Sequence, residues 1–207
     1  MANRTEILIS GFGGQGIVRL GQILGQAAVH EGLYTTMLIS HGTETRGGYV
    51  RSQVVLSPEP IDSPSVETPD FFCVFSGIAY QRFKNLCLEG MIIYDPAVIG
   101  SPDGNLSCHQ IPIAASKLAQ QELGNPIFAN TIMLGALGKQ LFGCLSRESL
   151  LKAIEDRLPR FHKENQQAFE LGYSFGVPTV RFGSRLRFGE HGIGPADKLP
   201  RRDAKLS

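Results

Sequence analysis

The segment ILISGFGGQGIVRLGQILGQAA, residues 7–28, constrains the fold of this chain more than any other. Its apolar start, residues 7–9, is typical of a buried strand. After a run of glycines, Ile17, Leu20 and Leu24 recur at the spacing of a helix face. A strand, a glycine loop and a helix in this order predict a loop that binds a phosphate or a nucleotide.

The glycines of the loop follow the spacing G-x-G-x-x-G at Gly11, Gly13 and Gly16, with a further glycine at Gly14. Glycine permits a tight turn and leaves no Cβ in the way of a phosphate. The helix that starts near Gln15 would present free N–H groups and its positive dipole end to an anion. A purely structural tight turn remains the alternative.

A standard NAD site also has an acidic residue at the end of the second strand. The second strand is expected at residues 34–40, and it is followed by His41 rather than by an acid. Glu44 comes later, inside a loop. A standard NAD site is therefore disfavoured.

Length and composition fit one large domain, or one domain with an appendage, because the chain has 207 residues and is 42% hydrophobic. No apolar run approaches the ~20 residues needed to span a bilayer. The N-terminus leads directly into the first strand pattern, which leaves no room for a signal peptide. These features predict a cytoplasmic protein that does not bind a membrane.

The four cysteines, Cys73, Cys87, Cys108 and Cys144, are widely spaced and form no C-x-x-C pair. The local signature of a zinc or iron–sulfur site is therefore missing, and we expect small buried side chains instead. No acid–base pair stands out either. The sequence predicts neither a catalytic residue nor a metal ligand.

Alternation of apolar strand patterns with helical ones continues to about residue 177 and predicts an α/β fold, with an open sheet covered by helices on both faces. The second strand, residues 33–40, is expected to be buried. Prolines in residues 57–69 predict a fixed, extended connection there.

Residues 178–207 carry seven Lys or Arg and three Asp or Glu, and they form a basic tail that is disordered or binds a partner. The tail contains no recognisable nucleic-acid module, so no nucleic-acid partner is expected.

The polar loop HGTETRGG, residues 41–48, would leave the second strand at the sheet edge that carries the glycine loop. His41, Glu44 and Arg46 would then lie near that loop. Arg46 could hold a phosphate or a carboxylate with two hydrogen bonds. Alternatively, Arg46 and Glu44 satisfy one another.

Together, GFGGQG, TETRGG, PI-x-x-P at residues 60–64, PD at residues 69–70 and ENQQAFELGY near residue 170 resemble the gamma subunit, or gamma domain, of 2-oxoacid:ferredoxin oxidoreductases. The resemblance runs from about residue 7 to residue 176. The family includes the pyruvate, 2-oxoglutarate, 2-oxoisovalerate and indolepyruvate enzymes.

This resemblance implies a Rossmann-like three-layer domain, residues 1–177, with a mostly parallel sheet. It also implies a complex that oxidatively decarboxylates a 2-oxoacid with coenzyme A and passes the electrons to ferredoxin. Thiamine diphosphate, magnesium and iron–sulfur clusters would be held by alpha, beta and delta-type partner subunits, and the isolated chain would be inactive. Residues expected to face a partner or an anionic ligand such as coenzyme A are Gly11, Gly13, Gly14, Gln15, Gly16, His41, Glu44, Arg46, Gly47 and Gly48.

The sequence departs from the family at His41, where many members have tyrosine. Histidine is similar to the indolepyruvate branch, whereas the Thr-Glu-Thr before Arg46 is similar to the short-chain or 2-oxoglutarate branches. The identity of the 2-oxoacid therefore stays open.

Two other functions also stay open, namely a stand-alone nucleotide-binding oxidoreductase and a scaffold without a ligand. The isolated subunit could form a homodimer through a surface that partners normally cover.

Overall fold

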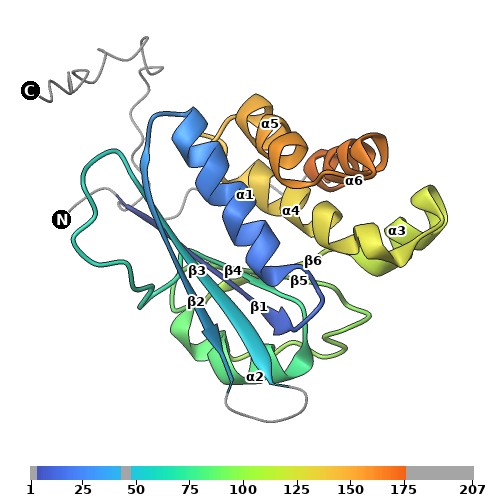
Figure 1. The fold of residues 1–207 in the computed structure, drawn as a ribbon. Coiled ribbons are helices and arrows are strands. Elements are labelled where there is room, and N and C mark those ends of the chain that lie inside the picture. The colour runs from blue at the N-terminus through green and yellow to red at the C-terminus, as the bar shows by residue number, and fades with distance from the viewer. Residues whose placement is uncertain (1–3, 43–47, 176–207) are drawn as a thin grey trace, which may run out of the picture.

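The computed structural model describes residues 4–42 and 48–175, which form a six-stranded sheet with the order β2-β3-β1-β4-β5-β6 (Figure 1). The strands are β1 (Thr5–Phe12), β2 (Tyr34–His41), β3 (Tyr49–Ser57), β4 (Phe71–Val74), β5 (Met91–Tyr94) and β6 (His109–Pro112). The helices are α1 (Ile17–His30), α2 (Gly77–Phe83), α3 (Ala115–Leu123), α4 (Ala129–Gln140), α5 (Arg147–Arg157) and α6 (His162–Ser174), with the short 3-10 helices η1 (Lys84–Leu86) and η2 (Pro126–Phe128).

Strand directions confirm the predicted α/β class with a mostly parallel sheet. β1, β4, β5 and β6 pair in parallel. β3 is antiparallel to both β1 and β2 and lies between them. β2 therefore runs in the same direction as β1, but one strand separates the two.

Helices cover both faces of this sheet, which confirms the three-layer arrangement (Figure 1). The helical layer on one face is thicker than the layer on the other. On one face α1, α4, α5 and α6 share a large apolar cluster with Ile7 and Ile9 of β1. On the other face α2 packs with Leu8, Phe72 and neighbouring residues. Because side chains alternate along a strand, β1 supplies apolar groups to both clusters, which explains its continuous apolar run.

The expectation of a buried second strand was wrong. β2 forms one edge of the sheet, and most of its residues are half-buried or exposed. Tyr34 and Ile39 each keep 44% of their surface exposed. β-branched and apolar residues favour strands in general, so this composition did not separate a central strand from an edge strand.

Two glycines allow α4 and α6 to pack with their backbones close together. A Cβ on Gly135 would lie 2.1 Å from the carbonyl oxygen of Phe169, and one on Gly172 would lie 1.8 Å from the carbonyl oxygen of Ile132. Gly135 thus permits the tight packing of α4 on α6. Gly172 has a packing role that its place near a helix end did not reveal.

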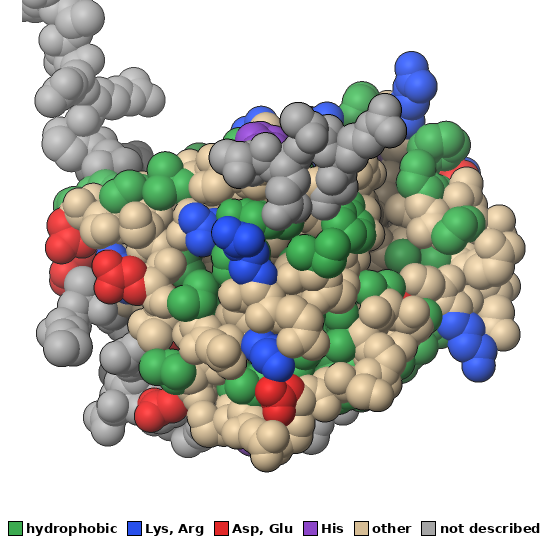
Figure 2. Space-filling model, turned by 90° about the horizontal axis from the view of Figure 1, so that it is seen from below, with side chains coloured by type: hydrophobic (Ala, Val, Ile, Leu, Met, Phe, Trp, Pro, Cys, Tyr) green, Lys and Arg blue, Asp and Glu red, His purple; other side chains and the backbone are tan. Residues whose placement is uncertain are grey.

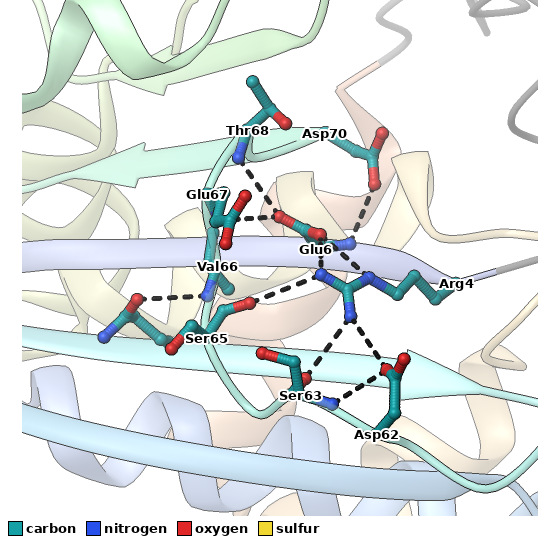
Figure 3. Close-up of polar contacts among 10 residues, drawn as sticks. Arg4, Glu6, Asp62, Ser63, Ser65, Val66, Glu67, Thr68 and Asp70 are labelled. Carbon is teal, nitrogen blue, oxygen red and sulfur yellow. Dashed lines mark hydrogen bonds and ion pairs between the residues drawn. The ribbon is translucent and has the colours of Figure 1, made fainter. Parts of the chain in front are cut away.

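The proline-containing connection between β3 and β4 is held by a polar cluster at the amino-terminal end of β1 (Figure 3). The buried carboxylate of Glu6 accepts hydrogen bonds from the guanidinium of Arg4 and from the backbone N–H groups of Glu67 and Thr68, the latter two at 2.9 and 3.2 Å. Arg4 also donates to the carbonyl oxygen of Ser63 at 3.3 Å. These contacts fix the connection, as its prolines predicted.

Candidate functional site

The glycine loop joins β1 to α1 at the carboxyl ends of the parallel strands. Gln15 donates its backbone N–H to the carbonyl oxygen of Phe12 at 3.3 Å, which closes the turn. Gly14 and Gly16 have φ angles of 88° and 81°. This left-handed region is costly for residues with a Cβ, so glycine is required at both positions by the backbone itself.

Gly11 and Gly13 differ in what the fold demands of them. A Cβ on Gly11 would lie 2.6 Å from the Cβ of Phe75, so that glycine is needed for packing. Among the described residues, the nearest atom to a Cβ on Gly13 would belong to the Val50 side chain, at 4.0 Å. Gly13 is also exposed and has no positive φ. The described residues give no steric or backbone reason for a glycine at this position, and its exposed backbone is open to close approach.

Two side chains fix the loop to other elements. The amide of Gln15 accepts a hydrogen bond from the N–H of Phe12 at 2.6 Å and donates one to the carbonyl oxygen of Phe75, after β4, at 2.9 Å. Asn130, in the first turn of α4, donates to the carbonyl oxygen of Gln15 at 3.3 Å. Its amide nitrogen would lie 2.5 Å from a Cβ on Gly16. Sequence reasoning missed Asn130, because the contact spans 115 positions.

A cavity of about 450 Å³ opens beside the loop, which is the size of a small-molecule site. Its walls come from the ends of β4 and β5 and from the starts of α3 and α4. Most of the lining is apolar. The lining residues are Gly14, Gln15, Val74, Phe75, Asp95, Val98, Ala115, Ser116, Asn125, Pro126, Ile127, Ala129, Asn130 and Met133.

The electrostatics of this cavity are set by helix ends. The amino-terminal turns of α3 and α4 line it, and Gly14 and Gln15 of the loop that leads into α1 border it, so three helix ends bring positive dipole potential to its surroundings. Asp95 is the single ionisable residue in the described lining, and it is already engaged: its two carboxylate oxygens accept from the N–H groups of Ala97 at 2.9 Å and Ser116 at 2.7 Å. Within the described residues no side chain caps α1 or α4, whereas the Asp95 carboxylate occupies the start of α3, so the starts of α1 and α4 remain available to an anion.

The second predicted loop is only partly described. His41 lies level with Val50 of β3, which in turn pairs with Gly11 of β1. His41 is therefore at the predicted edge of the sheet, two strand spacings from the glycine loop, or roughly 10 Å. Gly48 is half-buried and directly precedes β3. Glu44, Arg46 and Gly47 lie outside the described residues, as does the basic tail.

Two arginine side chains stack on aromatic rings near the start of β3, which follows this loop. The guanidinium carbon of Arg82 lies 4.6 Å from the ring centroid of Tyr49, and that of Arg51 lies 5.3 Å from the ring centroid of Phe83. Figure 2 views the molecule from below Figure 1 and shows Lys and Arg, together with some Asp and Glu, among hydrophobic side chains. Arginines beside aromatic side chains suit contact with another protein chain.

Other features of the described residues point away from a second site. A larger hollow of about 590 Å³ lies between α3 and α6, far from any strand end, and its charged lining residues, Glu122 and Glu170, are acidic. The described ranges contain no group of three or more His, Cys, Asp and Glu that could hold a metal ion. Across residues 4–42 and 48–175, no helix is long and apolar enough to cross a membrane.

Comparison with known proteins gives a family match over most of the chain. Residues 6–175 match the family described as "Pyruvate ferredoxin/flavodoxin oxidoreductase". A 2-oxoglutarate synthase subunit KorC from Methanocaldococcus jannaschii is 40% identical over 176 residues, which cover 82% of this chain and 92% of that protein. A pyruvate synthase subunit PorC from Methanothermobacter marburgensis is 32% identical, with 81% and 95% covered.

Solved structures share this fold. The gamma subunit of a keto/oxoacid ferredoxin oxidoreductase from Geobacter sulfurreducens has a TM-score of 0.72 at 28% identity, and the match covers 82% of this chain and 96% of that one. A 2-oxoglutarate:ferredoxin oxidoreductase from Magnetococcus marinus, solved with 2-oxoglutarate, coenzyme A and succinyl-CoA, has a TM-score of 0.74 at 28% identity. There the match covers 82% of this chain and 30% of the longer chain.

Proposed function

The chain belongs to the pyruvate ferredoxin/flavodoxin oxidoreductase family and is a gamma-type subunit of a 2-oxoacid:ferredoxin oxidoreductase, and we propose that its 2-oxoacid is 2-oxoglutarate. Four relatives that are 31–40% identical are 2-oxoglutarate synthase subunits. In the proposed reaction the carboxyl group next to the oxo group leaves as carbon dioxide and the acyl group joins the sulfur of coenzyme A. The thiol of coenzyme A loses its proton to the solvent, and the two electrons released pass to ferredoxin.

The cavity beside the glycine loop is proposed to hold part of coenzyme A. The observation that carries this proposal is the exposed glycine loop, which borders the cavity at Gly14 and leads into the uncapped amino-terminal end of α1, with the unobstructed Gly13 beside Gly14. Backbone N–H groups there would receive phosphate oxygens, and the apolar walls would contact the uncharged part of the ligand. Because the amide of Gln15 is already bonded at both ends, its proposed role is to hold the loop.

Partner subunits of alpha, beta and delta type are proposed to hold thiamine diphosphate, magnesium and the iron–sulfur clusters. The relatives named as subunits of 2-oxoglutarate synthase and pyruvate synthase support a complex of several chains among which the cofactors are divided. The side chains of the second loop, those of His41, Glu44 and Arg46, and the stacked arginines beside the loop would face these partners. The electrons would reach ferredoxin through the complex. The same proposal places the complex in the cytoplasm.

A stand-alone NAD-binding oxidoreductase finds no support in these comparisons. The position of β3 also disfavours it, because the end of β2 lies two strands from the glycine loop instead of one. Calorimetric titration of the isolated chain with NAD, NADP and flavins should give no heat of binding.

The proposal is tested on the complex assembled from all subunits. Ferredoxin reduction should be fastest with 2-oxoglutarate among 2-oxoglutarate, pyruvate and 3-methyl-2-oxobutanoate. Gly13→Ala should raise the KM for coenzyme A about tenfold and leave the KM for the 2-oxoacid unchanged. Gly104→Ala is the matched control, since a Cβ there meets no described atom within 4 Å and one on Gly13 meets only the edge of Val50, at 4.0 Å. Preference for another 2-oxoacid would overturn the substrate assignment, and unchanged coenzyme A kinetics would overturn the assignment of the cavity.

A further inference from the structure

The two edges of the sheet are unequal. β6, at one edge, has four residues and ends in Pro112, which has no N–H to donate. β2, at the other edge, has eight residues and contains no Lys, Arg, Asp, Glu or Pro. Natural proteins usually protect an edge strand with charges, prolines or short length, because a bare edge pairs with other strands. β2 has none of these protections.

The hydrogen-bond register shows which residues of β2 turn outward. Gly42 donates its N–H to the carbonyl oxygen of Tyr49 at 2.8 Å, so Gly42 faces β3. In an antiparallel pair, residues that bond to the neighbour alternate with residues whose N–H and C=O both point away. Counting back from Gly42, the residues whose backbone groups point to the outer edge, where no other described strand pairs with β2, are Thr35, Met37, Ile39 and His41.

The side chains of β2 are also suited to a contact. Met37 points to the α1 side, where its Cε would lie 2.7 Å from a Cβ on Gly21. Leu38 points to the opposite face and pairs with Gln53. Ile39 is 44% exposed even though it is a large apolar residue. Apolar and polar uncharged side chains therefore flank the free row of backbone groups on both sides.

We propose that β2 pairs antiparallel with β2 of a second copy of this chain, about a two-fold axis at Leu38. In this register Thr35 faces His41 of the other copy, and Met37 faces Ile39 of the other copy. All four outward residues then both donate and accept, with two hydrogen bonds in each pair. Shifting the register by two residues leaves some of these groups unpaired.

A second copy fits this strand for a reason of charge as well as of hydrogen bonding. Two-fold pairing brings each residue of β2 against another residue of the same uncharged strand, so no like charges meet and no buried ion is left alone. The sheet continues through the contact from one copy into the other. The isologous contact closes on itself and does not build a fibre, because the β6 edges remain outside it.

Disulfide trapping of the full-length chain tests the register. Leu38 would face Leu38 of the other copy as a non-hydrogen-bonded pair with about 4.5 Å between Cα atoms, which a disulfide can span. Leu38→Cys should therefore form a covalent dimer under mild oxidation. Thr36→Cys is the matched control: it should not cross-link to itself, but should cross-link when mixed with Ser40→Cys. The four native cysteines are buried. Cross-linking of Thr36→Cys alone, or none of Leu38→Cys, would overturn the register.

Light scattering measures the association without new cysteines. The wild-type chain should have twice its 22.5 kDa mass at high concentration. Ile39→Lys should remain a monomer, because lysine protects an edge. Leu88→Lys should still dimerise: Leu88 is 55% exposed but precedes β5, four strands from β2. A wild-type monomer at every concentration would overturn the proposal. So would cross-linking of Leu38→Cys to a different subunit in the assembled complex.

Discussion

The side-chain amide of Asn130 donates a hydrogen bond to the carbonyl oxygen of Gln15 at 3.3 Å, across 115 positions of the sequence. It links the first turn of α4 to the glycine loop. Because α4 packs in the middle of the large helical layer, the loop is held against the most buried helix of the fold. The shape of the cavity therefore depends on a contact that the glycine motif does not contain.

Replacement of Asn130 tests this dependence. Asn130→Ala should lower the free energy of unfolding by about 1 kcal/mol, the typical contribution of one such hydrogen bond. Asn130→Asp should weaken coenzyme A binding more than Asn130→Ala does. A carboxylate cannot donate to the Gln15 carbonyl, and it places a negative charge beside the proposed phosphate site. Denaturant titration and the KM for coenzyme A are the two measurements. Equal effects of both variants on that KM would contradict the electrostatic part of this argument.

The glycines of the loop should separate by function. Gly16→Ala should cost about 1–2 kcal/mol for the left-handed backbone alone. The contact with Asn130 adds to that cost. Gly13→Ala should stay within ~0.5 kcal/mol of wild type. Urea denaturation of the isolated chains measures both values, and a large loss of stability in Gly13→Ala would show that the fold does require that glycine.

The close packing of α4 on α6 predicts a large effect at Gly172. A Cβ there meets the backbone carbonyl of Ile132, which cannot turn away as a side chain can. Gly172→Ala should therefore destabilise the fold by about 3 kcal/mol, at the upper end of the cost of overpacking. Thermal unfolding followed by circular dichroism measures this. Gly100→Ala, in open space on the surface, is the control and should leave the Tm unchanged.

The cysteines should be unreactive in the folded chain. Burial raises the pKa of all four thiols, and it raises the pKa of Cys144 to about 12. At pH 8 the thiolate fraction of Cys144 is then roughly one in 10,000, and the thiolate is the reactive form. Ellman's reagent should detect almost no thiol in the native chain and four after denaturation. Fast reaction of the native chain would show that at least one thiol is accessible.

Much of the fold was predictable because it is encoded locally. The strand, glycine loop and helix over residues 7–28 form where their spacing predicted, and Ser146 caps α5 by accepting from the N–H of Ser149. The edge position of β2 was not predictable, since it depends on β3 inserting between β2 and β1. The roles of Asn130 and Gly172 were missed for the same reason. Each depends on a partner far away in the sequence.

The candidate site was predictable in part. The glycine loop and the strand end at His41 lie at the same edge of the sheet, as expected from the rule for ligand crevices. The cavity itself also needs the start of α3, η2 and the start of α4. These segments carry no motif, because apolar walls and helix ends are supplied by ordinary residues.

Affinity purification of this chain from its own host, under gentle conditions, tests the central claim most directly. The eluate would be analysed for co-purifying subunits, thiamine diphosphate, iron and sulfide, and for ferredoxin reduction with 2-oxoglutarate. We predict partner subunits that carry all of these cofactors and a 2-oxoglutarate-dependent, coenzyme A-dependent activity. A chain that purifies without partners or cofactors from cells that express it normally would contradict its assignment as a working subunit of such a complex.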